Sequence, residues 1–352
     1  MTIAAFSAAA GDVALEALFV PFMTGALSLP ADKRVLFLRA RDGFRLREMA
    51  QAGWLCEQSF KPFADALAHA GLRVQQGDLD DAERYPLVLV LPPRQRDEAR
   101  ALFARAVKHA APGGVVLASM PNTEGAKSGE ADLSRLAGPV GHLSKHKCRV
   151  FWTQPLADGV DALLQQEWLA LDSPRENAWD RVDTASALLA AHLPANLRGC
   201  VADLGAGYGY LSAQLLAHCP QVSSIDLYEA EARALTPARI NLTRAITERG
   251  DHAVFSLHWH DVAGGLSLPG QPKRYDVIVS NPPFHQGRAD LPDLGRAFIH
   301  AAADALRPDG CFWLVANRHL PYEATLSARF SQVHTVAIEE GFKVIEASGV
   351  RA

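Results

Sequence analysis

The residues Ser-Asn-Pro-Pro-Phe-His at positions 280–285 place chemically useful groups directly after an apolar run at 275–279. The apolar run predicts a buried strand, and the two prolines end it and stiffen the turn that follows. In an open α/β sheet, ligands bind at the carboxyl edge of the strands. There the Asn281 amide oxygen and the Pro282 carbonyl can accept the two hydrogens of an exocyclic amine, while the Phe284 ring stacks on the flat ring that carries it. The arrangement suits methyl transfer to a nucleobase amine. Asn-Pro alone is a common turn signal, so a plain turn is the default interpretation of this segment, and it is the glycine motif upstream that makes methyl transfer the better one.

A glycine-rich segment at 201–210, Val-Ala-Asp-Leu-Gly-Ala-Gly-Tyr-Gly-Tyr, predicts a strand, a tight turn and a helix. Glycines let the backbone turn sharply and let a ligand approach it closely, so we expect Gly205, Gly207 and Gly209 to contact a cofactor. Dinucleotide sites prefer the spacing G-x-G-x-x-G and bind a pyrophosphate. Here the spacing is G-x-G-x-G, and Asp203 precedes it. That carboxylate would repel a pyrophosphate, but it suits the cationic sulfonium and ammonium groups of S-adenosylmethionine.

A second predicted strand, at 222–229, ends in acid about twenty residues after the glycine turn, where an acid commonly binds ribose hydroxyls. Together with the Asn-Pro-Pro-Phe turn, this arrangement resembles the class I S-adenosylmethionine-dependent methyltransferases that modify nucleobase amines. The family's spacing to the following helix implies Glu229, rather than Asp226, as the ribose ligand. The resemblance also implies that Asp261, beyond the expected third strand, faces the adenine amine of the cofactor.

Further segments resemble the bacterial small-subunit rRNA guanine-N2 methyltransferase C family. They are 312–317, 319–322 and 341–344 in the second half, and 121–128 and 147–149 in the first. The resemblance is strong from about residue 180 onward and patchy before it. It implies a guanine of 16S rRNA as the substrate, although the Asn-Pro-Pro motif alone does not distinguish guanine from adenine. One departure is Ala185, which replaces a glycine in the family's D-x-G-S-x-L-L segment at 183–189.

The first half of the chain resembles a degenerate copy of the second half. Residues 35–44 correspond to 201–210, but Arg39 and Arg41 stand where the second half has glycines. Residues 87–93 likewise correspond to 277–283; the prolines are kept and the Asn is lost. Ordered matches of this kind indicate a duplication in which the first copy cannot bind the cofactor.

We therefore predict an α/β protein with two tandem Rossmann-like class I methyltransferase domains. The first domain is expected at 1–155; it is degenerate and has an RNA-binding or structural role. The second is expected at 160–352; it binds the cofactor and catalyses the reaction. A chain of 352 residues suits two domains of ordinary size.

The composition narrows the class of protein. No run approaches eighteen apolar residues, and the N-terminus lacks a signal-peptide pattern, so we expect a cytoplasmic protein without a membrane segment. The five cysteines are scattered without metal-ligand spacing, and the thirteen histidines show no metal motif, so we expect free thiols and no metal. We expect a monomer.

An RNA partner has to be reconciled with a net charge of −4. Residues 1–160 hold 19 Lys and Arg against 17 Asp and Glu, a net of +2, whereas the remainder holds 16 against 22, a net of −6. Two basic runs in the first half, at 33–47 and at 145–149, are therefore the candidate rRNA contacts, because phosphate contacts dominate non-specific affinity for RNA.

Three other functions stay open from the residues. One is guanine-N2 methylation of 23S rRNA. Another is methylation of adenine N6 or of a protein glutamine, where Asn-Pro-Pro-Tyr/Phe also occurs. The third is a non-catalytic RNA-binding assembly factor, which the intact Asp203, Glu229 and Asn281 argue against.

Overall fold

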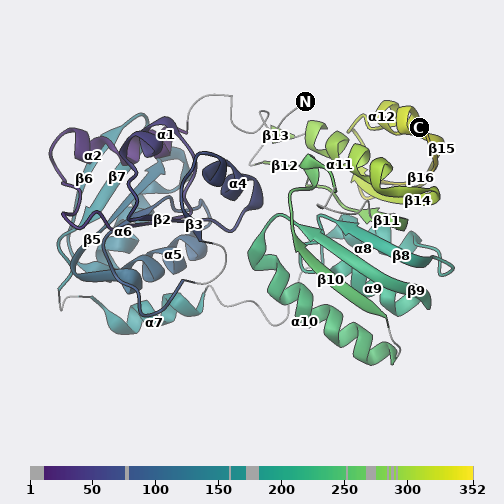
Figure 1. Ribbon diagram of the computed structural model, residues 1–352, viewed down its shortest axis with the longest axis horizontal. Helices are drawn as coiled ribbons and strands as arrows, with labels where there is room; N and C mark the ends of the chain where they lie inside the picture. Colours follow the sequence, from purple (N-terminus) through teal and green to yellow (C-terminus); the bar gives the residue numbers. More distant parts are fainter. Residues whose placement is uncertain are drawn as a thin grey trace. The chain divides into compact units, whose positions relative to one another are not determined.

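The computed structural model describes residues 12–75, 79–157, 160–171, 182–250, 253–266, 275–283, 285–286, 289–290 and 292–351. The chain divides into two compact units, Met1–Ser173 and Pro174–Ala352. Each unit is built around one seven-stranded sheet with helices on both faces (Figure 1).

The first unit alternates short helices with mostly parallel strands. Its strands are β1 (Val35–Leu38), β2 (Trp54–Glu57), β3 (Val74–Gln75), β4 (Tyr85–Val90), β5 (Ala110–Pro121), β6 (Val140–Lys145) and β7 (Cys148–Thr153). Its helices are α1 (Val13–Leu18), α2 (Val20–Met23), α3 (Phe44–Met49), α4 (Lys61–His69), α5 (Arg96–His109), α6 (Ala126–Ala137) and α7 (Ala162–Ala170), with a 3-10 turn at η1 (Asn122–Glu124).

The second unit repeats this plan. Its main-sheet strands are β8 (Arg198–Leu204), β9 (Gln221–Glu229), β10 (Val254–Trp259), β11 (Tyr275–Ser280), β14 (Leu306–Asn317), β15 (Phe330–Glu339) and β16 (Phe342–Val350). A small antiparallel pair is formed by β12 (His285–Gln286) and β13 (Ala289–Asp290). Its helices are α8 (Thr184–His192), α9 (Tyr210–His218), α10 (Ala232–Arg249), α11 (Pro292–Ala305) and α12 (Glu323–Arg329), with a 3-10 turn at η3 (Val262–Gly264).

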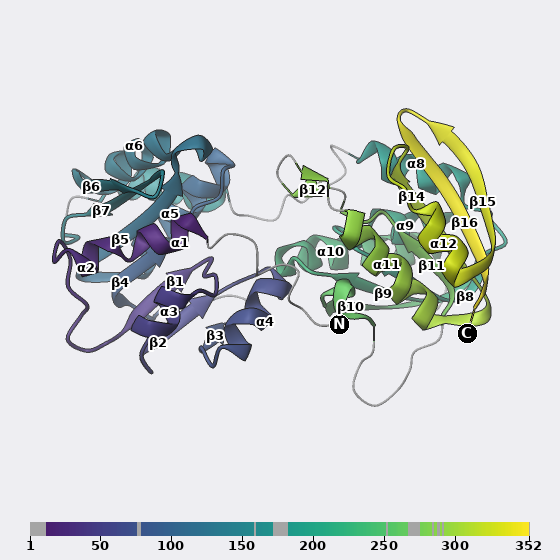
Figure 2. The same ribbon diagram turned by 90° about the horizontal axis from the view of Figure 1, so that it is seen from above.

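The two sheets have the same topology. The strand order is β3-β2-β1-β4-β5-β7-β6 in the first unit and β10-β9-β8-β11-β14-β16-β15 in the second. In both, five strands pair in parallel, and the last two strands of the unit form an antiparallel hairpin on the sheet, as Figure 2 shows for β15 and β16. An identical order of seven strands, crossovers included, confirms the predicted pair of tandem Rossmann-like domains.

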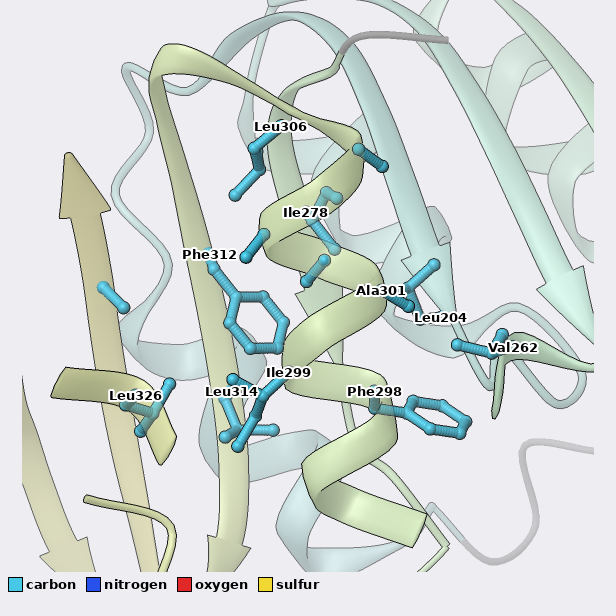
Figure 3. Packing of buried hydrophobic residues seen from close by; sticks show 14 of the residues in the cluster. Leu204, Val262, Ile278, Phe298, Ile299, Ala301, Leu306, Phe312, Leu314 and Leu326 are labelled. Carbon is cyan, nitrogen blue, oxygen red and sulfur yellow. The ribbon is translucent and has the colours of Figure 1, made fainter. Parts of the chain in front are cut away.

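Alternation along the strands places an apolar core on each face of each sheet. In the second unit, Ala202, Leu204 and Ile278 face the core beneath α11, where Phe298 and Ile299 pack (Figure 3). The neighbouring positions along the strands pack instead against α8, α9 and α10 on the opposite face; they include Val201, Val277 and Val279.

The boundary between the units lies later than the predicted 155–160. Helix α7 packs against α5, and its Trp168 is buried in the core of the first unit, so this helix belongs to that unit. The sequence of α7 has no clear apolar face, so it did not indicate to which of the two units the helix belongs.

Candidate active site

Three neighbouring parallel strands end at one edge of the second sheet and bring the predicted site residues together. β8 pairs with β9 on one side and with β11 on the other, so Asp203 lies between Leu227 and Val279. The Ser280 hydroxyl donates a hydrogen bond to the Leu204 carbonyl (2.7 Å) and joins the two strand ends. The glycine turn, Glu229 and Asn281 consequently share this edge, the usual ligand edge of an open α/β sheet.

The glycine turn depends on backbone conformations that favour glycine. Gly205, Gly207 and Gly209 have φ of +72°, +53° and +82°. A Cβ at Gly209 would lie 2.6 Å from the Leu242 side chain, whereas one at Gly207 would meet nothing within 4 Å. Gly209 is thus needed for packing against α10, whereas a side chain at Gly207 would face open space.

Glu229 is held against this turn. One carboxylate oxygen accepts the Gly207 N–H and the other accepts the Glu231 N–H, both at 2.7 Å. Burial raises the pKa of Glu229, and these backbone donors oppose the rise. Asp226, the other candidate, is bonded instead to His258 (3.0 Å) and Tyr275 (2.8 Å), so the geometry favours Glu229 for the predicted ribose contact.

Asp203 is completely buried beneath the turn. Its Oδ2 accepts the Ser212 hydroxyl at 2.7 Å, and its Oδ1 has no hydrogen-bond partner among the described residues. Burial raises the pKa of Asp203 to about 7, and the nearby Glu229 charge adds to that effect. A buried acceptor without a donor costs about 1–3 kcal/mol, so a cationic ligand group would find a prepared partner here.

Asn281 shows a similar imbalance. Its Nδ2 donates to Asp183 Oδ2 (2.7 Å) and to the Ser186 hydroxyl (2.8 Å), but its buried Oδ1 has no partner in the described part of the chain. The following Pro282 is buried. Phe284, the predicted stacking residue, lies outside the described residues.

Asp261 follows β10 at the same edge. The neighbouring His260 N–H donates to the Glu229 carbonyl (2.9 Å), which sets this segment beside the end of β9. The Asp261 side chain caps η3 by accepting the Ala263 N–H at 3.0 Å. Its contact with an adenine amine stays a prediction.

Sequence reasoning missed the residues that support these groups. Asp183 and Ser186 hold Asn281, Ser212 binds Asp203, and Asn241 donates to the Tyr208 carbonyl at 2.9 Å. Asp183 and Ser186 carried a detectable signal, because both match the family's D-x-G-S-x-L-L segment and an aspartate before an apolar helix is a typical N-cap. Ala185, the departure from the family segment, is a residue of α8 and is buried in the apolar core.

The equivalent edge of the first unit has none of these groups. By strand register, Phe37 stands at the place of Asp203 and Gln58 at the place of Glu229. The Gln58 amide accepts the Phe60 N–H (2.9 Å) and donates to the Ala40 carbonyl (2.6 Å). Both of its polar groups are therefore bonded to the backbone of the loops that follow β1 and β2. The Arg39 guanidinium reaches across to the Leu91 carbonyl (3.3 Å), at the position of Asn281. These contacts confirm that the first copy is degenerate.

The described residues contain neither a metal-binding cluster nor a helix that could span a membrane. No group of three His, Cys, Asp or Glu side chains in the described ranges could hold a metal ion. No helix within the same ranges is long and apolar enough to cross a membrane.

Comparison with known proteins agrees with this geometry. Residues 172–346 match the family model of the methyltransferase small domain. A Shewanella pealeana ribosomal RNA small subunit methyltransferase C is 30% identical over 79% of this chain and 82% of its own length. The Shewanella oneidensis protein of the same name is 28% identical over 76% and 78%.

A solved structure shares the fold of both units. It is a T. thermophilus 16S rRNA methyltransferase in complex with AdoMet and guanosine, with a TM-score of 0.72 and 23% identity over 90% of this chain and 88% of that one. The sequence match over most of both chains, together with the duplicated sheet and the intact second site, shows that the chain belongs to the ribosomal RNA small subunit methyltransferase C family.

Proposed function

We propose that the protein transfers a methyl group from S-adenosylmethionine to the exocyclic N2 amine of a guanine in 16S rRNA. The observation that carries the proposal is the buried, unpartnered Asn281 Oδ1 at the ligand edge, an acceptor that lacks only a donor. The guanosine in the T. thermophilus structure supports guanine over adenine, and the names of the relatives support small-subunit rRNA as the substrate.

The chain's residues fit S-adenosylmethionine as a cofactor. Asp203 Oδ1 would accept from its cationic end, Glu229 from the ribose hydroxyls and Asp261 from the adenine amine. The open space at Gly207 gives the cofactor room against the backbone. The bound cofactor supplies an electrophilic methyl group on its sulfonium.

The protein then has to position and polarise the amine. The N2 lone pair of guanine is delocalised into the ring, and as the nitrogen attacks it pyramidalises and its hydrogens become more acidic. Asn281 Oδ1 and the Pro282 carbonyl therefore bind the transition state better than the planar amine. Phe284 holds the base by stacking, and the base must be unpaired or flipped out to reach the site.

Replacing Asn281 with Ala tests this role. We expect binding of S-adenosylmethionine to stay close to wild type while methyl transfer falls by about 100- to 1,000-fold, as for other preorganised hydrogen-bond partners. The rate is measured as N2-methylguanosine formed in rRNA, by mass spectrometry of nucleosides. A near-normal rate would show that other groups hold the amine.

Nucleoside mapping in a deletion strain separates the alternatives. Loss of a methylguanosine from 23S rRNA, of N6-methyladenine or of a methylated protein glutamine would each identify a different substrate. Failure to bind S-adenosylmethionine in calorimetry would instead support a non-catalytic assembly factor. We also propose a cytoplasmic protein, as an rRNA substrate requires, and a monomer, which light scattering tests.

For the first unit we propose an RNA contact at the turn between β6 and β7, with Lys145, His146 and Lys147 exposed. Neither lysine forms an ion pair with any described residue. The arginines of the other basic run are engaged within the unit: Arg41 pairs with Asp12 (2.8 Å) and Arg47 with Asp42 (3.2 Å).

The second unit has the same turn with the opposite charge. His146 and Lys147 have φ of +52° and +58°, and Glu340 and Gly341 have +50° and +85°. The backbone anchor is also equivalent, because Asn122 donates to Lys147 as Arg318 donates to Gly341. A lysine thus occupies a left-handed position that the other unit fills with glycine, which supports selection for its charge.

A further inference from the structure

Two residues at the start of α8 contact the Asn281 side chain across nearly one hundred residues of sequence. Asn281 Nδ2 donates to Asp183 Oδ2 at 2.7 Å and to the Ser186 hydroxyl at 2.8 Å. The same Asp183 oxygen accepts the Ser186 N–H at 2.9 Å and so caps the helix. One carboxylate oxygen therefore joins the beginning of α8 to the turn after β11.

This contact determines which way the Asn281 amide faces. An ionised carboxylate only accepts hydrogen bonds, so the NH₂ end of the amide must lie against it. Rotating the amide by half a turn would bring Asn281 Oδ1 against the Asp183 oxygen, where no hydrogen bond can form. The Ser186 hydroxyl could donate to the rotated amide, so the Asp183 carboxylate is the group that sets the orientation. Asn281 Oδ1 is consequently held on the opposite side, where it is buried and unpartnered.

We infer that Asp183 and Ser186 are positioning residues that lock Asn281 with Oδ1 presented to the substrate amine. The inference rests on the proposed function and adds to it a reason why Asn281 is preorganised. Neither residue touches the reacting atoms; both act through the orientation of one amide. If the Asn281 amide could rotate freely, a fraction of the protein molecules would present its NH₂ group to the substrate amine. Both groups are hydrogen-bond donors, so no hydrogen bond would form between them.

Asp183 also lies beside the cofactor turn. The Tyr208 hydroxyl is within hydrogen-bonding reach of the Asp183 backbone. An effect of Asp183 on cofactor binding is therefore the competing explanation, and the experiment has to separate the two.

The variants are chosen so that the helix cap survives. Asp183→Ser keeps a capping oxygen, since Ser and Asp are about equal as N-caps, but its side chain is too short to reach Asn281. Asp183→Asn keeps an oxygen that accepts both N–H groups. Ser186→Ala removes the second bond alone. The matched control is Asp161→Ser, because Asp161 caps α7 with the same bond to the third residue on (Leu164 N–H, 2.9 Å) in the first unit.

We expect Asp183→Ser to lower the single-turnover rate of methyl transfer by about 10- to 100-fold, since misplacing a catalytic group by about 1 Å can cost that much. Its Kd for S-adenosylmethionine should stay within about twofold of wild type. Asp183→Asn should recover most of the rate, Ser186→Ala should be impaired less than Asp183→Ser, and Asp161→Ser should match wild type.

The decisive comparison is made in an Asn281→Ala background. There Asp183→Ser should change the remaining rate by less than about twofold, because the amide that it positions is gone. A reduction that persists undiminished in this background, or one expressed as weaker cofactor binding, would overturn the inference.

A readout without turnover distinguishes failure of the inference from failure of the proposed function. The side-chain ¹⁵N–¹H₂ resonances of Asn281, assigned by their loss in Asn281→Ala, should exchange slowly with solvent in wild type and Asp183→Asn. They should exchange faster in Asp183→Ser. Equal exchange in all three would refute the lock whatever the substrate is, whereas a normal exchange pattern with no guanine methylation would count only against the proposed function.

Discussion

At the scale of single residues, Asp203 combines complete burial, one unpartnered oxygen and a pKa raised to about 7 by desolvation. The folded protein therefore holds a proton on this carboxyl between about pH 4 and 7 that the unfolded chain releases. Because the folded state binds more protons in that window, this group makes the free energy of unfolding fall as pH rises through it.

Binding of the cofactor should show the opposite dependence. A cationic ligand group pairs with the ionised form, so the affinity for S-adenosylmethionine should increase as pH rises toward 7, by up to about tenfold per unit, and then level off. Calorimetric titrations from pH 5.5 to 8 measure this slope. A wild-type affinity that does not vary over this range would show that Asp203 is not the group that pairs with the cation.

Replacing Asp203 with Asn separates stability from binding. The variant keeps the bond with Ser212, removes the buried charge, and should raise the melting temperature above pH 7 by a few degrees. It should also weaken cofactor binding and abolish the pH slope. A lower melting temperature at pH 8 would mean that the buried carboxylate stabilises the folded state.

At the scale of elements, two glycines of the turn after β8 have different roles: Gly207 leaves room for the cofactor, and Gly209 allows close packing against α10. Gly207→Arg should lose only about 1 kcal/mol of stability, the cost of a side chain at the left-handed φ of +53°, because a Cβ there meets nothing within 4 Å; it should nevertheless fail to bind S-adenosylmethionine, because its side chain fills the space that the ligand needs. Gly209→Ala should instead lower the melting temperature, because its Cβ would lie 2.6 Å from Leu242. Paired melting and calorimetry measurements check this division, and unaltered binding in Gly207→Arg would contradict it.

The elements that the sequence predicted are those with strong local signals. The glycine spacing, the apolar strands and the Asn-Pro-Pro turn were enough to locate β8, β9 and β11 and their shared edge. The Asp183–Asn281 contact was not predictable, because it depends on how α8 packs against the sheet, and a single sequence does not record packing. Gln58 escaped notice for a related reason: only strand register shows that it stands at the place of Glu229.

The turn between β6 and β7 holds Lys147 in a left-handed conformation, and replacing this residue tests what the conformation costs. Lys147→Gly should stabilise the protein by about 1 kcal/mol, since a left-handed conformation costs a side-chain-bearing residue roughly that much. The same change should weaken RNA binding by removing a charge. Chemical denaturation measures the first effect, and a destabilised variant would show that the lysine side chain supports the fold.

At the scale of the whole molecule, we expect one S-adenosylmethionine per chain. The second unit carries the acids and the open turn, whereas Phe37, Arg39 and Gln58 occupy the equivalent places in the first. Calorimetry gives the stoichiometry. A value of two would mean that the first unit binds the cofactor by other groups.

The proposal that the first unit contacts RNA while the second unit catalyses the reaction also predicts how RNA affinity depends on salt. Reversing Lys145 and Lys147 to Glu should weaken RNA binding and make the log–log slope of affinity against salt shallower, by about 0.7–0.9 for each phosphate that the lysines neutralise. Affinity for S-adenosylmethionine should not change. Filter binding across a salt series measures the slope.

Two matched variants show whether the position of the charge matters. Reversing Glu339 and Glu340 to Lys changes the equivalent turn of the second unit, and it should not weaken RNA binding. Reversing Arg39, Arg41 and Arg45 to Glu should lower stability more than it lowers RNA affinity, since these residues are engaged within the unit. If only the arginine reversal weakened RNA binding, the RNA would bind at that run.

The repeated strand order also has a kinetic consequence. The central pairing of each sheet joins distant residues, Val35 with Leu87 in the first unit and Val201 with Val277 in the second, and such long-range parallel pairing forms slowly. All seven strands of the first unit lie within Met1–Ser173, so its sheet can close before the other unit exists. A ribosome adding roughly 5–20 residues per second needs on the order of ten seconds or more to make Pro174–Ala352. During that interval the degenerate copy can complete its own sheet, which removes its strand edges from competition with the nearly identical pairing pattern of the catalytic copy.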